Sequence, residues 1–364
     1  MKSLFAEAAD QFRPDGLILE VRPFGMGNIH QTFLVTLTNT QKFILQRVNT
    51  DVFPHPEWIM QNIRTLGYHV QNRLQQLPAA SGRRWELPRV LLTPKGQDHW
   101  IGPDGSFWRA LSFIEGARSY DTIQDLEQAG EVGYALGMFH VLTRDLPVES
   151  LLDTLEGYHI TPGYLLRFDV ALAKRKLSGS PELDYGMRFI NQRRTGVDIL
   201  EKAKERGTLE LRPIHGDPKV NNVMIDIVTR QAVSLVDLDT VKPGLIHYDI
   251  SDCLRSGCNP LGEETEEWEK ARFELDLCRA ILKGYLAEAG NFLRKNDYQY
   301  LFEAIRLITF ELGLRFITDY LEGNIYFKAV NEKQNLNRAL VQFWLCQSIE
   351  EQESAIRAMI QELP

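Results

Sequence analysis

Two features are scarce in this sequence of 364 residues, and each scarcity excludes a class of protein. Long apolar runs are absent, because the most apolar stretch, residues 307 to 321, is broken by three charged side chains and is unsuited to crossing a bilayer. Surplus positive charge is also absent, since the formal net charge is −8. Affinity for nucleic acid depends on clustered Lys and Arg, so we expect neither nucleic acid nor membrane as a partner.

Cysteine is rare as well, with four residues and no CxxC pair: Cys253, Cys258, Cys278 and Cys346. Cys253 and Cys258 are close enough in sequence to share a metal ion, but no His or second pair lies nearby. Reduced and mostly buried thiols are the simpler interpretation. The first twelve residues lack the basic start and apolar block of a signal peptide. These observations predict a cytoplasmic protein.

What is present is an ordinary folded composition, with 44% hydrophobic and 25% charged residues. The length suits two packed lobes, because one domain usually holds about 100–200 residues. In the first third, β-branched and apolar runs predict five strands, the last folded at Gly102-Pro103-Asp104-Gly105, and apolar residues at helical spacing after Pro56 predict one helix. The expected strands cover residues 17–23, 32–37, 43–48, 89–93 and 99–113.

Beyond Gly116 the pattern becomes helical. A helix is expected to start near Asp125 and to carry His140 on its apolar face as a core residue, and a later helix is expected over residues 298–322. Between them lie two short β-like runs, within residues 213–226 and 232–239. The sequence therefore predicts an α+β protein with a small lobe, residues 1–113, and a larger, mostly helical lobe, residues 114–364.

A polar loop between two apolar runs holds the residues that phosphoryl transfer requires. The segment from Pro213 to Ile225 contains Asp217 and Asn222, and the next apolar run ends at Asp237. A carboxylate is needed to accept the proton of the attacking hydroxyl, while an amide oxygen and a second carboxylate can hold Mg²⁺. Hard oxygen ligands without a His/Cys cluster argue against zinc. The alternative is a polar loop with ordinary turn aspartates.

This segment resembles the catalytic loop of the aminoglycoside phosphotransferase and choline kinase superfamily, relatives of the protein kinases. His215, Asp217 and Asn222 match that loop, Asp237 matches the aspartate that opens the next motif, and Asp249 matches one that braces the loop. The resemblance implies a bilobal protein-kinase-like fold that uses ATP and Mg²⁺. It implies catalytic roles for Asp217, His215 and Lys219, with Asp217 as base and His215 as a brace, and metal ligation by Asn222 and Asp237. Asp239 is a candidate for a second ion or a structural role.

The small lobe extends the resemblance. Gly25-Met26-Gly27, between two expected strands, looks like the loop that covers the phosphates, although two glycines alone usually indicate only a turn. Residues 113 to 116 would be the hinge that meets adenine. The implied nucleotide contacts are Gly25, Gly27, Asn28, Gln46, Phe113 and Glu115.

One position departs from the superfamily pattern. The small-lobe lysine that pairs with the phosphates is replaced by Gln46, because alignment of the apolar pair before it leaves no other match. Strand alternation sends Arg47 to the opposite face and leaves Lys42 two pleats away. Either Mg²⁺ and another base handle the phosphate charge, or Gln46 pairs with a polar helix residue such as Asn62.

A closer resemblance covers roughly residues 15 to 335. Residues 27–33, 43–50 and 314–323 look like the corresponding stretches of N-acetylhexosamine 1-kinases, which also carry glutamine at the lysine site. It implies phosphorylation of the anomeric hydroxyl of N-acetylglucosamine or N-acetylgalactosamine. The implied substrate contacts are His30, Arg315, Asp319, Tyr320 and Tyr326.

Each of these contacts has a simpler alternative. Glu311, Arg315, Asp319 and Glu322 form one polar row on the long helix, which is either a sugar-cleft lining or a solvated stripe of ion pairs worth ~0.3–0.5 kcal/mol each. A histidine beside a turn, such as His30, is commonly a surface or capping residue. The alternative functions are a kinase of homoserine, choline, an aminoglycoside or another sugar, and a ligand-binding pseudokinase. The sequence indicates no oligomeric state.

Overall fold

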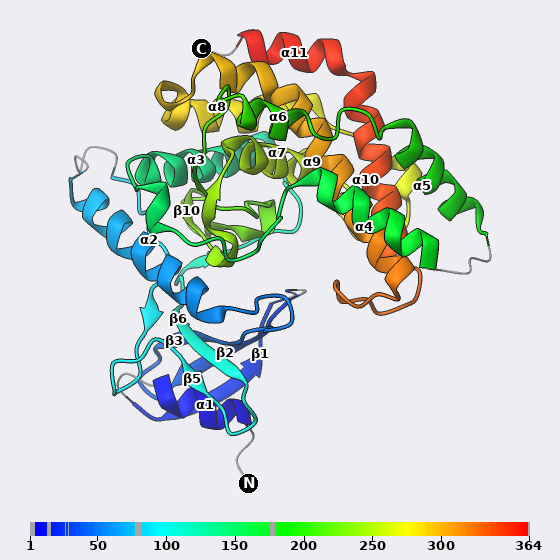
Figure 1. Ribbon diagram of the computed structural model, residues 1–364. Helices are drawn as coiled ribbons and strands as arrows, with labels where there is room; N and C mark the ends of the chain where they lie inside the picture. The colour runs from blue at the N-terminus through cyan, green and yellow to red at the C-terminus, as the bar shows by residue number, and fades with distance from the viewer. Residues whose placement is uncertain are drawn as a thin grey trace.

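The computed structural model describes residues 4–12, 16–25, 27, 29–76, 82–174 and 179–362. Figure 1 shows two lobes, a small β-rich lobe that holds the N-terminus and a larger, mostly helical lobe that holds the C-terminus. This arrangement confirms the predicted α+β class. In the described ranges, no helix combines the length and apolarity needed to span a membrane.

The small lobe is built on one antiparallel sheet, in which β1 to β4 and β6 have the order β1-β2-β3-β6-β4 and β5 pairs with β6. Helix α1 (Leu4–Phe12), which the sequence pattern did not reveal, buries Ala8, Ala9 and Phe12 against the sheet. The strands are β1 (Ile18–Pro23), β2 (Gln31–Leu37), β3 (Lys42–Arg47), β4 (Val90–Leu91), β5 (Trp100–Ile101) and β6 (Phe107–Ser112).

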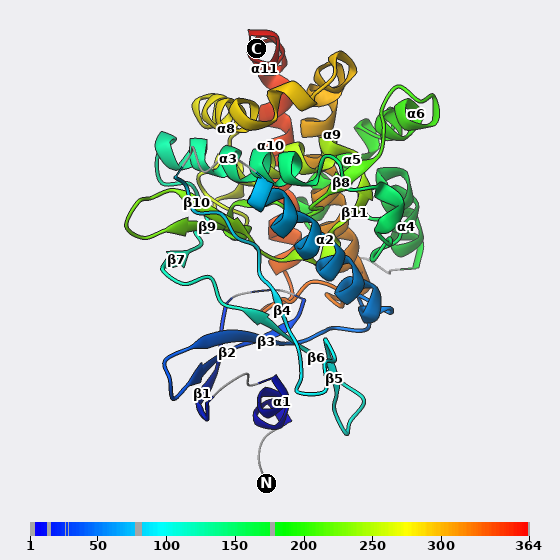
Figure 2. The same ribbon diagram turned by 90° about the vertical axis from the view of Figure 1, so that its left-hand side faces the viewer.

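Helix α2 (Pro56–Gln76) lies between the lobes and packs with the large one (Figure 2). Its apolar residues join the large-lobe core, and Asn62 Nδ2 donates to the carbonyls of Leu152 and Val241, at 2.8 Å each. The alternative in which Asn62 pairs with Gln46 is therefore wrong. Asn62 instead fixes α2 to the large lobe.

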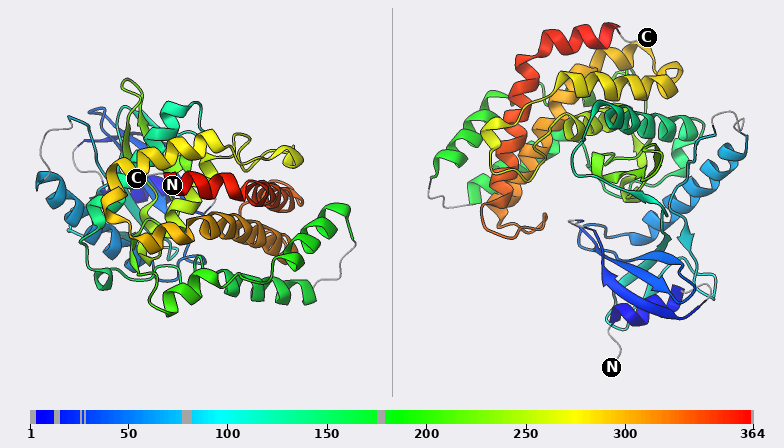
Figure 3. Two further views of the ribbon diagram at one scale, coloured as in Figure 1. Left: turned by 90° about the horizontal axis from the view of Figure 1, so that it is seen from above. Right: turned by 180° about the vertical axis from the view of Figure 1, so that it is seen from behind.

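The large lobe contains two small sheets, β10-β9-β7 and β11-β8, surrounded by helices (Figure 3). β7 (Ala117–Arg118) belongs to a large-lobe sheet, while β6 of the small-lobe sheet ends at Ser112. The other elements are α3 (Leu126–Thr143), α4 (Thr161–Lys174), α5 (Pro181–Gln192), α6 (Ile199–Glu205), β8 (Arg212–Ile214), β9 (Val223–Asp226), β10 (Ala232–Leu235), β11 (Lys242–Gly244), α7 (Ile246–Gly257), α8 (Leu275–Ala289), α9 (Lys295–Glu322), α10 (Gln334–Glu351) and α11 (Glu353–Glu362).

Candidate active site

A cavity of about 450 Å³ lies between the lobes. The small lobe contributes the β1–β2 loop, which includes Gly25 and Gly27, and the side chain of Gln46. The large lobe contributes the loop after β8, the segment after β10, and residues of α7 and α9. The predicted catalytic and metal-binding residues Asp217, Lys219, Asn222 and Asp237 all line this cavity.

Asp249 of α7 holds the loop after β8 in place. Its Oδ2 accepts from the His215 backbone N–H at 2.7 Å, and its Oδ1 accepts from the Gly216 N–H at 2.8 Å. Gly216 has φ +87°, and a Cβ there would lie 2.6 Å from the Thr240 carbonyl oxygen, so only glycine fits. His140 Nε2 lies 2.9 Å from Asp249 Oδ2, so this histidine is a core residue with a structural partner.

His215 is fully buried, and both of its ring nitrogens contact the protein itself. Nε2 donates to the Val236 carbonyl at 3.0 Å, and Nδ1 accepts from the Asp217 N–H at 3.3 Å. No ring nitrogen is left for a substrate. His215 is therefore placed to position the loop and not to transfer protons.

Asp217 and Lys219 form an ion pair, with Lys219 Nζ 2.7 Å from Asp217 Oδ2. Burial raises the pKa of Asp217, Lys219 opposes that rise, and the carboxylates of Asp252 and Asp237 add to it. Burial disfavours the charged form of Lys219, but Asp217 and Asp237 outweigh it and raise the pKa of Lys219. The pair can therefore keep Asp217 available as a base beside other negative groups.

Asn222 and Asp237 present oxygen ligands of the kind that Mg²⁺ prefers. Asn222 Nδ2 donates to the Asp217 carbonyl at 2.7 Å, which leaves Oδ1 without that contact and available to a metal. Asp237 follows β10 in a left-handed conformation, with φ +66°, an unusual backbone for a residue other than glycine. The Val236 N–H donates to the Asn222 carbonyl at 2.9 Å and joins the two segments. This donor set fits Mg²⁺, which commonly binds one or two protein ligands together with phosphate oxygens.

Gln46 lines the cavity, while Arg47 contacts Asp104 on the outer surface. The side chain of Lys42 lies 3.6 Å from that of Glu115 and 5.4 Å from the Phe113 ring centroid. This is the register that strand alternation predicts. Phe113 and Glu115 do not line the cavity, so the hinge prediction concerns only their backbone groups, of which the Glu115 carbonyl already accepts from Arg84. Asn28 lies outside the described residues.

Gln46 donates to Thr32 Oγ1 of the neighbouring strand at 3.1 Å, and its other partner is Arg109 of β6, which the sequence did not suggest. Arg109 is buried, and its Nε and Nη2 donate to Gln46 Oε1 at 3.0 and 2.8 Å. Its Nη2 also lies 2.7 Å from Asp239 Oδ2 in the large lobe. Gln46 and Arg109 are directly opposite in the β3–β6 pairing. The buried guanidinium of Arg109 therefore contacts Gln46, the residue at the position where the superfamily pattern has lysine.

Asp239 receives contacts from two parts of the small lobe. Besides Arg109, His30 Nε2 lies 2.6 Å from Asp239 Oδ2. Burial alone would raise the pKa of Asp239, but Arg109 and His30 hold it well below its usual range. His30 Nδ1 accepts from the Asn49 N–H at 3.0 Å, so both ring nitrogens are occupied within the protein. The expected substrate hydrogen bond from His30 would require one of these contacts to break.

At the far end of the cavity Arg315 lies among aromatic rings. Its guanidinium carbon is 4.9–5.8 Å from the ring centroids of Tyr158, Tyr164, Tyr326 and Phe327. Among the described residues, no carboxylate forms an ion pair with it. Arg315 and Tyr326 thus lie where the resemblance put them, on the lining of the cavity.

Asp319 and Tyr320 do not, and these two expectations need correction. Asp319 Oδ1 accepts from the N–H groups of residues 325 and 326, and Oδ2 from that of residue 327 and from Asn335 Nδ2, all at 2.8–2.9 Å. Its carboxylate shapes the loop that holds Tyr326 and has no oxygen free for a sugar. Tyr320 packs against the large-lobe core, outside the cavity lining.

Several lining residues escaped the sequence analysis. Asp252 and Arg255 follow Asp249 on α7 at spacings of three, so helical periodicity from the bracing aspartate could have found them. His159 lines the cavity beside Glu311, but no local pattern distinguishes it. Glu322, the last member of the polar row, pairs with Arg167 and lies outside the cavity lining.

Comparisons with known proteins agree with this geometry. The profile of the phosphotransferase enzyme family matches residues 20–286, more than half of the chain. An aminoglycoside phosphotransferase from Alicyclobacillus acidocaldarius has a TM-score of 0.60 and 15% identity, covering 98% of this chain and 96% of that one. A choline kinase from Cryptosporidium parvum has a TM-score of 0.58 and 14% identity, with 94% and 91% covered.

A spectinomycin phosphotransferase, solved in complex with ADP and spectinomycin, has a TM-score of 0.53 and 14% identity, with 91% and 93% covered. At such identities these structures support the fold, and the family follows from the profile match. The chain therefore belongs to the phosphotransferase enzyme family and is a small-molecule kinase.

Proposed function

We propose that this kinase transfers the γ-phosphoryl group of ATP to the anomeric hydroxyl of an N-acetylhexosamine, giving the sugar 1-phosphate. The use of ATP is supported by the related spectinomycin phosphotransferase that was solved with ADP. The nucleotide would lie beneath the β1–β2 loop, next to Gly25, Gly27 and Gln46, and the sugar would lie between Asp217 and Arg315.

Asp217 is the base of the proposed reaction. Its carboxylate accepts a hydrogen bond from the sugar hydroxyl and takes the proton as the oxygen bonds to the γ-phosphorus and the bond to the leaving ADP oxygen breaks. Burial raises the pKa of Asp217, and the ion pair with Lys219 opposes that rise. Asn222 and Asp237 would hold Mg²⁺, which when bound offsets the charge of the phosphates. Asp249 and His215 keep the loop in position.

The choice of acceptor rests on the charged side chains in the acceptor half of the cavity, the part between Asp217 and Arg315. Four lining carboxylates contact a basic side chain of the protein: Asp217 contacts Lys219, Glu311 contacts His159, and both Asp252 and Glu263 contact Arg255. Arg315, in contrast, pairs with no described carboxylate.

Recognition of choline or an aminoglycoside would need an unpaired carboxylate or a vacant aromatic cage. Here the aromatic rings that could form such a cage, including those of Tyr158 and Tyr326, already surround the positive charge of Arg315. An uncharged, hydroxyl-rich acceptor is favoured. The stretches shared with N-acetylhexosamine 1-kinases then favour an acetamido sugar over other sugars.

Product analysis tests the proposal. The protein is incubated with ATP and Mg²⁺ and with N-acetylglucosamine, N-acetylgalactosamine, glucose, homoserine, choline or an aminoglycoside, and phosphorus NMR identifies the product. We expect phosphate on the anomeric oxygen of an N-acetylhexosamine. Phosphate found only on a primary hydroxyl or an amino alcohol would refute the hexosamine assignment and leave the phosphotransferase family unaffected.

A further inference from the structure

A second carboxylate, Asp252, faces the acceptor half of the cavity. It lies one turn after Asp249 on α7, and its residue is only 5% exposed. Its Oδ1 accepts from Arg255 Nε at 2.8 Å. Its Oδ2 is buried and has no hydrogen-bond donor among the described residues. Buried carboxylate oxygens are normally satisfied, so this one calls for a donor from outside the protein chain.

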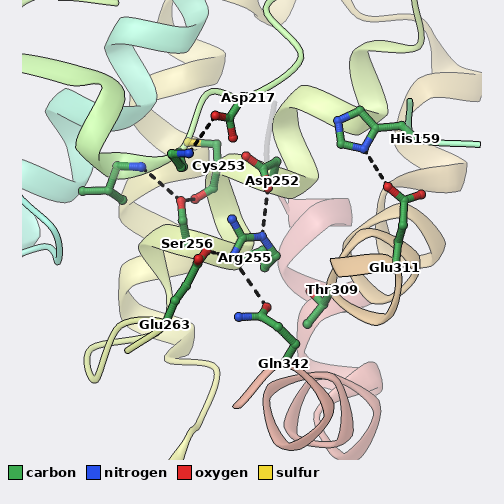
Figure 4. A network of polar contacts seen from close by, with 12 residues as sticks. His159, Asp217, Asp252, Cys253, Arg255, Ser256, Glu263, Thr309, Glu311 and Gln342 are labelled. Atoms are coloured by element: carbon green, nitrogen blue, oxygen red, sulfur yellow. Dashed lines mark hydrogen bonds and ion pairs between the residues drawn. The ribbon is translucent and has the colours of Figure 1, made fainter. Parts of the chain in front are cut away.

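Asp252 cannot easily turn away, because its partner is fixed. Arg255 is buried and also pairs with Glu263, and its Nη1 lies 3.5 Å from Gln342 Oε1 (Figure 4). The guanidinium is therefore bound on several sides, and it holds Oδ1 of Asp252. An oxygen fixed in this way is suited to selecting a ligand by the position of its donor.

The unpaired oxygen also lies near the catalytic base. In Figure 4, Asp252 is seen between Asp217 and Arg255. Asp217 and Asp252 line the same cavity, and the Asp252 carboxylate is one of the groups that raise the pKa of Asp217. A molecule whose hydroxyl reaches Asp217 would therefore bring its neighbouring groups next to Asp252.

We propose that Asp252 Oδ2 accepts a hydrogen bond from a second donor of the acceptor molecule, a hydroxyl or amide N–H close to the hydroxyl that is phosphorylated. This inference rests on the proposed transfer at Asp217 and narrows its substrate class. The acceptor needs at least two neighbouring donors, as in a polyol or an acylamino sugar. A simple monohydroxy alcohol leaves the buried oxygen unpaired and is a poor substrate.

The first test is the Asp252→Asn variant. Its amide oxygen will turn toward Arg255, so the NH₂ group replaces Oδ2 and a donor stands where an acceptor is needed. We expect the KM for the acceptor to rise about tenfold or more, while the KM for ATP changes less than about twofold. An acceptor KM equal to that of the wild type would overturn the proposal.

Asp297→Asn is the matched control. Asp297 is also buried and also pairs with an arginine, Arg212, at 2.9 Å, but it does not line the cavity. The control should lower the Tm without changing the acceptor KM. If both variants raise the acceptor KM equally, the effect of Asp252→Asn is structural and the proposal fails.

Acceptor analogues that lack one donor at a time complete the test. One analogue of the series lacks the donor that Asp252 contacts. With that analogue alone, the wild type and Asp252→Asn should have nearly equal kcat/KM. An unchanged ratio between the two proteins across the whole series would overturn the proposal. If Asp252→Asn does not fold, Asp252→Glu, which keeps the charge but moves the oxygen, must change the analogue profile; a wild-type profile would refute the contact.

These outcomes separate the two proposals. If the wild type phosphorylates an acceptor other than an N-acetylhexosamine, the hexosamine assignment fails, and Asp252 is tested with donor-deleted analogues of that acceptor. If the wild type uses monohydroxy alcohols as efficiently as polyols, the Asp252 contact is refuted and phosphoryl transfer at Asp217 is unaffected.

Discussion

His159 Nδ1 lies 3.0 Å from Glu311 Oε1, and this buried pair connects the long helix α9 to the loop after β8. The other nitrogen of the ring, Nε2, lies 2.8 Å from the Gly216 carbonyl oxygen, immediately before Asp217. Both neighbours are acceptors, so the ring satisfies both only when it is protonated. Burial lowers the pKa of His159, but Glu311 and the Gly216 carbonyl outweigh burial and raise it.

This pair predicts a pH-dependent stability. Because the pKa of His159 is higher in the folded protein than the ordinary value of about 6.5, its stabilisation is complete below that value and is lost as the pH rises through the folded pKa. The Tm advantage of the wild type over His159→Gln should therefore shrink with rising pH. Thermal unfolding of both proteins between about pH 6 and pH 9 measures this. A constant difference would show that His159 stays neutral.

Replacement of the base should separate binding from chemistry. Asp217→Asn removes the proton acceptor, so turnover should fall at least ~10²-fold while ATP binding is retained. Steady-state kinetics and a nucleotide-binding assay measure the two effects. Asp169→Asn, which alters a surface pair with Arg194, is the control and should behave as the wild type. Near-normal turnover of Asp217→Asn with every acceptor would remove Asp217 from the mechanism.

The metal site is tested at Asp237. Asp237→Ala removes one of two proposed oxygen ligands, so transfer should be abolished, and nucleotide binding should lose its dependence on Mg²⁺. A thermal shift with nucleotide, with and without Mg²⁺, gives a readout that does not depend on activity. Activity that survives at ordinary Mg²⁺ concentrations would mean that another carboxylate holds the ion.

Arg109 and Arg47 lie on neighbouring strands of the small-lobe sheet, and their replacement can be compared directly. Arg109→Ala leaves Asp239 buried without its main cation, which should cost ~3–5 kcal/mol of unfolding free energy and raise the KM for ATP. Arg47→Ala breaks a half-exposed contact with Asp104 and should cost less than about 1 kcal/mol. Denaturant unfolding compares them. Equal effects would show that the Arg109 contacts do not stabilise the protein.

Arg315 should affect the acceptor and not the nucleotide. Arg315→Ala removes the unpaired cation from among the surrounding aromatic rings. The fall in kcat/KM for the sugar should correspond to a loss of ~1–3 kcal/mol of transition-state stabilisation, and the KM for ATP should hardly change. Asp319→Asn provides the contrast, because its carboxylate holds only the loop after α9. We expect it to lower the Tm more than Arg315→Ala does. A large loss of ATP affinity in Arg315→Ala would contradict the assignment.

Local pattern was sufficient to predict residues that the fold brings together at the candidate site. The loop with Asp217 and Asn222, Asp237 after β10 and Asp249 on α7 lie within one short stretch of sequence. The fold class follows from the change from period-two to helical patterning. The contacts of Gln46 were not predictable, because Arg109 is 63 residues away and becomes its neighbour only through the β3–β6 register. The same limit concealed His159, whose partners lie on α9 and in the loop after β8.

The polar row on α9 shows a different limit. Glu311 and Arg315 line the cavity, while Asp319, one turn further, faces the loop that follows the helix. Spacing places these side chains on one face but does not show where that face passes from the cavity to the next loop. A carboxylate that caps a loop and one that binds a sugar have the same helical periodicity.

The two contacts to Asp239 have an energetic consequence. His30 from the β1–β2 loop and Arg109 from β6 bind one carboxylate, two residues beyond Asp237. Loss of either partner changes how strongly Asp239 interacts with the other. The change in unfolding free energy of a variant that lacks both His30 and Arg109 should therefore differ from the sum of the two single changes. The same coupling applies to ligands. An ion or nucleotide that reorients residues 237–239 must also change the free energy of the His30 contact, and a change in that contact must change the affinity for the ligand by the same factor.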